Sequence, residues 1–75
     1  MTQHDYAAVL FHSTSHAIRG EKVLKEAGVS CKLIPVPRQL SSDCGVCLRI
    51  LRADRERVCD AVTGIGIEIQ GIEDF

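Results

Sequence analysis

Residues 6–36 read YAAVLFHSTSHAIRGEKVLKEAGVSCKLIPV, and this stretch predicts a strand, a helix and a second strand. The run Tyr6–Phe11 is almost wholly apolar, which is typical of a strand buried on both faces. A helix is expected from about His16 to Ala27, because the Ser-Thr-Ser cluster at 13–15 supplies N-cap residues. Gly28 then occupies the position at which glycine commonly ends a helix.

The rest of the chain repeats this alternation of strands and helices. A strand is expected from about Ser30 to Val36, and Pro35 places it at a sheet edge because proline cannot donate to a neighbouring strand. After a polar loop, the remaining expected elements are a strand at Gly45–Leu51, a helix from Asp54 to about Val62 and an alternating strand at Ile65–Ile72.

The resulting order, strand-helix-strand-strand-helix-strand, is typical of ferredoxin-like α+β folds. We therefore expect a single domain over residues 1–75, with its core at about 6–72. The sheet should be antiparallel in the order 4-1-3-2, with both helices on one face. In this topology the end of the first strand, the start of the first helix and the start of the third strand lie together, which collects residues 11–16 and 38–44 at one edge.

The composition argues against several classes of partner. Nine basic and ten acidic residues give a net charge of −1, so no basic excess exists for nucleic acid or an anionic membrane. One tyrosine, two phenylalanines and no tryptophan offer few stacking platforms for bases or large planar cofactors. No apolar run approaches the roughly 18 residues of a membrane span, and the first residues lack the basic start of a signal peptide. We expect a cytoplasmic protein with reduced thiols and no cofactor.

The leading candidates for chemistry are the four cysteines, Cys31, Cys44, Cys47 and Cys59. Side chains alternate between the two faces of a strand, so Cys44 should lie on the same face as Val46, Leu48 and Ile50. If these three face the helices, the Cys44 thiol is expected near the start of the first helix. Free N–H groups and the helix dipole at such a start lower the pKa of a thiol. His12, His16 and Arg38 would add positive charge there, whereas Asp43 would raise the pKa. The alternative is that Cys44 is a small buried apolar residue.

Cys44 and Cys47 also form a C-x-x-C string, which is typical of redox dithiols and of metal sites. In an extended strand such a pair is roughly 10 Å apart and points to opposite faces, whereas a disulfide needs Cα atoms within about 7 Å. We therefore predict no Cys44–Cys47 disulfide, unless a bulge at Gly45 brings the two together. A zinc site would need four convergent ligands, so no metal is expected. A thiol redox or metal-binding role for the pair stays open as an alternative.

A family resemblance is carried by three strings, LFHSTSHA at 10–17, IPVPR at 34–38 and LSSDCG at 40–45. Together they resemble the small bacterial family of selenium/sulfur carrier-like proteins, over residues 6 to 72. The family's Ser-Thr turn and Cys-Gly pair match Ser13, Thr14, Cys44 and Gly45, whereas Cys47 is not part of the pattern. The resemblance implies a carrier role for Cys44.

These observations predict a sulfur or selenium carrier rather than an enzyme. Cys44 would accept a chalcogen atom from a donor protein and pass it to an acceptor protein. The residues expected to bind around it are Ser13, Thr14, Ser15, His16, Arg38 and Gly45. One alternative is a binding or regulatory module that holds a small anion at the same helix start. Another is an interaction subunit that pairs through its open sheet face, and a homodimer is compatible with the sequence.

Overall fold

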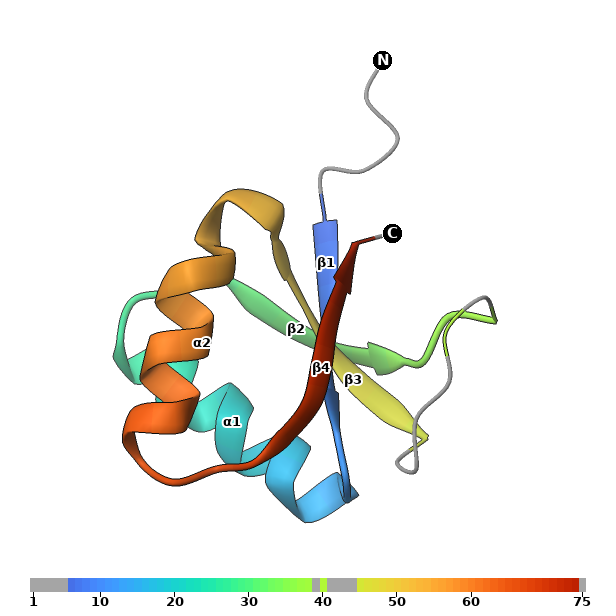
Figure 1. Cartoon of the computed structure of the whole chain (residues 1–75), viewed down its shortest axis with the longest axis horizontal. Coiled ribbons are helices and arrows are strands. Elements are labelled where there is room, and N and C mark those ends of the chain that lie inside the picture. Colours follow the sequence, from blue (N-terminus) through green and yellow to red (C-terminus); the bar gives the residue numbers. More distant parts are fainter. Residues whose placement is uncertain (1–5, 39, 41–44, 75) are drawn as a thin grey trace.

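The computed structural model describes residues 6–38, 40 and 45–74, and the elements follow the predicted order. The strands are β1 (Tyr6–Phe11), β2 (Cys31–Pro35), β3 (Val46–Leu51) and β4 (Ile69–Asp74). The helices are α1 (Thr14–Glu26) and α2 (Arg55–Gly64), and a short 3-10 helix, η1 (Arg52–Asp54), leads into α2. Figure 1 shows both helices on the same side of a twisted sheet. No helix in the described part of the chain is long and apolar enough to cross a membrane.

The sheet is antiparallel, with the strand order β2-β3-β1-β4. This is the predicted order 4-1-3-2 read from the opposite edge, so the ferredoxin-like arrangement is confirmed. The structure also confirms that β3 lies between β1 and β2, and that β2, which contains Pro35, is an edge strand.

The strand register brings three chain segments to one end of the sheet. Leu10 pairs with Cys47, which in turn pairs with Ile34. One position further along the sheet lie Phe11, the last residue of β1, and Val46, the first residue of β3. These two residues are therefore at the same end, and α1 begins only three residues after Phe11. We call this the α1 end of the sheet.

The main core lies between the sheet and the helices. Its buried members are Ala7, Val9, Phe11, Ala17, Leu24, Val29, Leu48, Ile50, Val58, Val62 and Ile67. Every residue of β1 except Tyr6 is buried, which confirms that this strand is covered on both faces. Leu48 and Ile50 face the helices, as the alternation in β3 predicted.

A second, smaller cluster covers part of the sheet face that the helices leave open. Ala8, Leu10 and Cys47 are buried there, and Ile34, Val36 and Leu40 pack against them. The half of this face nearest the α1 end is therefore apolar and closed. The covering residues come from β2 and the segment after it.

Both helices end in the same hydrogen-bonded motif around a glycine with positive φ. After α1, Gly28 (φ 79°) donates to the Lys25 carbonyl at 3.1 Å, and Val29 donates to the Leu24 carbonyl at 2.8 Å. After α2, Gly66 (φ 82°) and Ile67 make the equivalent bonds, to the carbonyls of Thr63 and Val62, at 3.1 and 3.0 Å. These are Schellman motifs, in which glycine adopts the left-handed conformation at no steric cost.

The second motif changes the predicted start of the last strand. Residues Ile65 to Ile72 alternate as a strand would, but β4 begins only at Ile69. Ile65 is instead the C-cap of α2 and is 45% exposed, while Gly66 turns the chain and Ile67 enters the main core. The prediction that this strand starts at Ile65 is therefore wrong.

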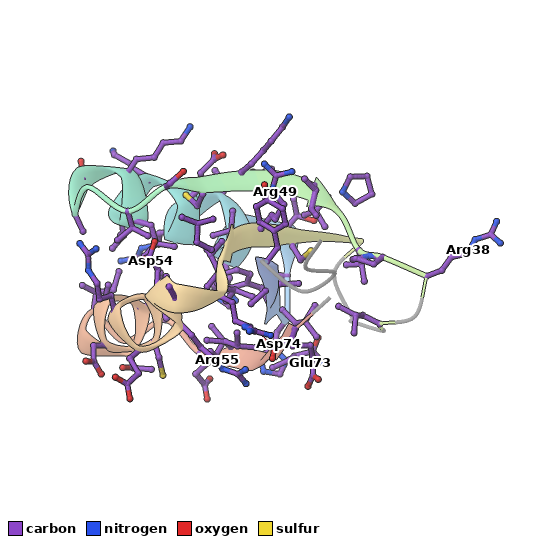
Figure 2. The ribbon with its side chains drawn as sticks, turned by 90° about the horizontal axis from the view of Figure 1, so that it is seen from above. Arg38, Arg49, Asp54, Arg55, Glu73 and Asp74 are labelled. Carbon is purple, nitrogen blue, oxygen red and sulfur yellow. The ribbon has the colours of Figure 1, made fainter. Side chains whose placement is uncertain are left out.

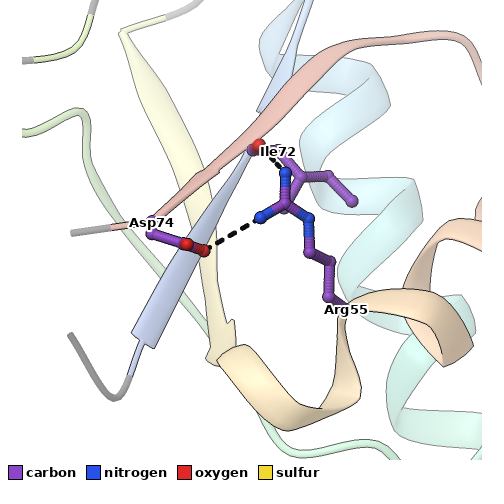
Figure 3. A network of polar contacts seen from close by, with 3 residues as sticks. All are labelled: Arg55, Ile72 and Asp74. Carbon is purple, nitrogen blue, oxygen red and sulfur yellow. Dashed lines mark hydrogen bonds and ion pairs between the residues drawn. The ribbon is translucent and has the colours of Figure 1, made fainter.

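A side-chain clamp joins α2 to β4, as Figure 3 shows. The Arg55 guanidinium donates through Nη2 to the Ile72 carbonyl at 2.7 Å, and its Nη1 lies 3.0 Å from Oδ1 of Asp74. Because both side chains of the ion pair are partly exposed, water screens their attraction. The clamp fixes the first turn of α2 beside β4.

Gly20 allows α1 to approach the sheet closely. A Cβ at this position would lie 2.9 Å from Cζ of the buried Phe11 ring. We expect Gly20→Ala to lose about 1–3 kcal/mol through overpacking, offset in part by about 1 kcal/mol of helix propensity. Urea unfolding measures the net loss. Gly64→Ala is the matched control, because no atom lies within 4 Å of its added Cβ. A Gly20→Ala protein as stable as the control would contradict the close approach.

Candidate functional site

The start of α1 is built around Ser13. Its side-chain oxygen accepts a hydrogen bond from the His16 backbone N–H at 3.3 Å, and its carbonyl accepts one from the Ala17 N–H at 3.1 Å. The prediction that one residue of the Ser-Thr-Ser cluster caps the helix is confirmed, and α1 begins at Thr14, two residues earlier than expected. Thr14 and Ser15 are exposed.

The first turn of α1 contains no acidic side chain. The partial positive charge of the helix N-terminus is therefore not neutralised by a carboxylate of its own first turn. An anionic sulfur at this position would be stabilised by the helix dipole.

His16 lies at the edge of the buried face of α1. Its side chain is half-buried, and its Nδ1 atom is shielded from solvent with no hydrogen-bond partner in the structure as described. Buried polar atoms are normally paired, so an orphaned nitrogen needs an explanation. Here it is a polar group that a bound molecule could satisfy.

The chain enters β3 through Gly45, which is exposed. The Gly45 carbonyl accepts a hydrogen bond from the Val36 N–H at 3.2 Å, which ties the start of β3 to the end of β2. The residue that directly follows Cys44 is thus fixed at the α1 end. Cys44 itself, with Ser41, Ser42 and Asp43, lies outside the described residues, so the orientation of its thiol stays a prediction.

Arg38 is exposed on the segment after β2. Figure 2 shows its side chain pointing away from both helices and the sheet. The structure therefore does not bring Arg38 to the start of α1, and its role as an anion clamp stays a prediction.

Cys47 is completely buried in the second cluster, on the sheet face opposite the helices. This confirms the predicted alternation of β3, in which Cys47 lies on the face opposite Leu48. The pairing of β3 with its neighbours runs unbroken from Val46. Cys31 and Cys59 are half-buried and are not in disulfides. Within the ranges 6–38, 40 and 45–74, no three His, Cys, Asp or Glu side chains are grouped as metal ligands would be.

The chain is similar to known proteins over most of its length. A family described as "Putative Se/S carrier protein-like" matches residues 6–73. The chain belongs to this family. It is also 32% identical over 56 residues to the Uncharacterized protein YtiA of Escherichia coli (strain K12). That match covers 75% of this chain and 66% of the relative, so the chain spans just under two thirds of the relative's length. No solved structure matches this chain.

Among the described cysteines of this Se/S carrier-like chain, Cys31 sits beside α1. Its thiol lies 3.8 Å from the Glu21 carbonyl oxygen and donates to it. Burial raises the pKa of Cys31, and the nearby Glu21 carboxylate raises it further, while Lys25 lowers it. Each of the first two effects disfavours the thiolate, so Cys31 is a poor nucleophile near neutral pH.

This environment predicts that Glu21→Gln accelerates alkylation of Cys31 at fixed pH. The substitution removes a negative charge and frees Lys25, which pairs with Glu21 at 3.6 Å, and both changes lower the thiol pKa. The acceleration should stay below about tenfold, because partly exposed charges are screened. Site-resolved iodoacetamide labelling measures it. Glu26→Gln, an exposed position on the same helix, should leave the rate unchanged; an equal effect there would rule out the local cause.

Proposed function

We propose that this chain is a sulfur or selenium carrier that holds one chalcogen atom on Cys44. The observation that carries the proposal is the position of Gly45 at the same sheet end as the Ser13-capped start of α1. Membership of the Se/S carrier-like family, over residues 6–73, supports the same reading. We further propose a cytoplasmic location, because persulfide exchange requires reduced thiols.

The proposed transfer is an exchange between sulfur atoms with no net oxidation. The Cys44 thiolate attacks the terminal sulfur of a persulfide on the donor protein. A new S–S bond forms, the donor's S–S bond breaks, and its electron pair leaves with the donor thiolate. An acceptor thiolate later attacks the same terminal sulfur, and Cys44 departs as a thiolate. A terminal selenium atom would follow the same steps through a selenosulfide.

The α1 end suits this chemistry because one atom is anionic in each state: the Cys44 sulfur before loading, and the terminal chalcogen after it. The N-terminus of α1 has no carboxylate in its first turn, so its dipole stabilises negative charge. The orphaned Nδ1 of His16 is a polar group at the same end that could contact the carried atom. Ser13 holds the first turn in place through its cap.

Intact-protein mass spectrometry tests the proposal after incubation with a cysteine desulfurase and cysteine. The wild-type protein should gain the mass of one sulfur atom, and dithiothreitol should remove it. Cys44→Ser should gain nothing, whereas Cys31→Ser and Cys59→Ser, at half-buried positions, should load normally.

Two results would contradict the proposal. Loading that persists in Cys44→Ser would move the carried atom to another cysteine. A wild-type protein that several donors fail to load would exclude the carrier role and favour the anion-binding module instead.

A further inference from the structure

Two basic side chains project side by side from the sheet face opposite the helices. Lys32 of β2 pairs directly with Arg49 of β3. Directly opposed residues of an antiparallel pair lie on the same face with their Cβ atoms about 4.5–5.5 Å apart, and like charges so placed repel each other. An anion bound between the two side chains would relieve this repulsion.

No carboxylate in the described residues supplies such a negative charge. The ion pairs of this part of the chain are Lys25–Glu21, Arg55–Asp74 and Arg57–Asp54, and neither Lys32 nor Arg49 takes part. On the same row of the sheet, the acidic residue is Glu73 of β4, but Ala8 lies between Arg49 and Glu73. Two strand spacings, about 9–10 Å, therefore separate their backbones. Figure 2 also shows Arg49 and Glu73 apart.

The Arg49 guanidinium is held in place by Tyr6. Its Cζ atom lies 4.5 Å from the centroid of the Tyr6 ring. A cation over the face of an aromatic ring is attracted to it, and the guanidinium has five N–H donors. Contact with Tyr6 thus holds Arg49 near one place while N–H donors stay available for an acceptor.

A pocket of about 320 Å³ opens at this place, and Tyr6, Ser30, Lys32 and Arg49 contribute to its lining. Its volume is at the small end of the range for ligand sites. Two cations, one of them a guanidinium, and a hydroxyl match an anion with several oxygen atoms and more than one negative charge.

We propose that Lys32, Arg49 and Ser30 form a binding site for a doubly charged oxyanion, of which a phosphate group is the type. The site is distinct from the α1 end. Arg49 lies four residues along β3 from Gly45, which is about 13–14 Å of extended chain. Binding of an anion at this site does not depend on Cys44. The anion site can therefore be tested separately from the carrier function.

Titration with inorganic phosphate, followed by backbone amide NMR of the wild-type protein, tests the site. Saturable shifts should concentrate at residues 30–32 and 49–51, and acetate at equal ionic strength should produce much weaker ones. Arg49→Gln should weaken phosphate binding about tenfold or more, because a charge-assisted hydrogen-bonding group is lost. Arg49→Lys keeps the positive charge but removes the guanidinium fork. Its affinity for phosphate should therefore fall between those of the wild-type protein and Arg49→Gln.

Lys22→Gln is the matched control for Lys32→Gln, because Lys22 is an exposed lysine on α1. Lys32→Gln should weaken phosphate binding, and Lys22→Gln should not. Equal weakening in both would show a general effect of net charge and overturn the site. Shifts confined to residues 13–17 would place the anion at the start of α1 instead, and the absence of a saturable shift would also overturn the proposal.

Discussion

Phe11→Ala is expected to lower the free energy of unfolding by about 3–5 kcal/mol. Phe11 is completely buried and is the largest of the fully buried side chains in the described residues. It fills the space beside Gly20, which has no side chain of its own to close the gap. At about 0.05–0.15 kcal/mol per residue, 75 residues correspond to a total stability of about 4–11 kcal/mol, so the variant should be close to its unfolding transition at room temperature.

Urea unfolding monitored by circular dichroism measures this loss. Ile18→Ala is the control, because Ile18 is also a large apolar residue but is 53% exposed on α1. Its loss should be within about 0.5 kcal/mol. Similar losses in the two variants would show that the core is not centred on Phe11.

The four thiols are expected to differ widely in alkylation rate, with Cys44 fastest and Cys47 slowest. Cys47 is completely buried, so iodoacetamide reaches it only when the structure opens. If global unfolding is required, its rate should be about a thousandfold or more below that of an accessible cysteine. Partial displacement of the covering residues Val36 and Leu40 would reduce this protection. Phe11→Ala should also increase the Cys47 rate.

Peptide mapping after limited alkylation gives the four rates separately. A Cys44 rate no higher than that of an unstructured cysteine would mean that the α1 end does not stabilise its thiolate. Rapid labelling of Cys47 would contradict the second cluster. The same mapping after oxidation tests the prediction that Cys44 and Cys47 form no disulfide, which a bridge in good yield would disprove.

The topology was predictable because each of its determinants is local in sequence. The apolar run of β1, the cap at Ser13 and the glycine after α1 all act within a few residues of where they occur. Pro35 marked the edge strand for the same reason, since its missing N–H cannot join a ladder. The start of β4 was missed because alternation around Gly66 fits a strand and a helix-ending turn equally well. Only the backbone conformation separates them.

The features of the site that were missed depend on contacts between distant segments. The packing of Leu40 against the second cluster depends on the path of the chain after β2, which periodicity does not encode. The Arg55–Asp74 clamp joins residues far apart in sequence and depends on side-chain geometry. Lys32 and Arg49 could have been paired only from an exact strand register. Ser13, by contrast, was identifiable because capping is a local interaction.

The central position of β1 has a consequence for how the chain folds. β1 is the earliest strand in the sequence, yet its two neighbours, β3 and β4, are the last two. Its buried apolar residues therefore have no strand partner until most of the chain has left the ribosome. Because such distant pairings require large loops to close before any contact is gained, folding should be slow for a domain of this size. During synthesis, the exposed β1 segment is the part of the nascent chain most in need of protection from aggregation.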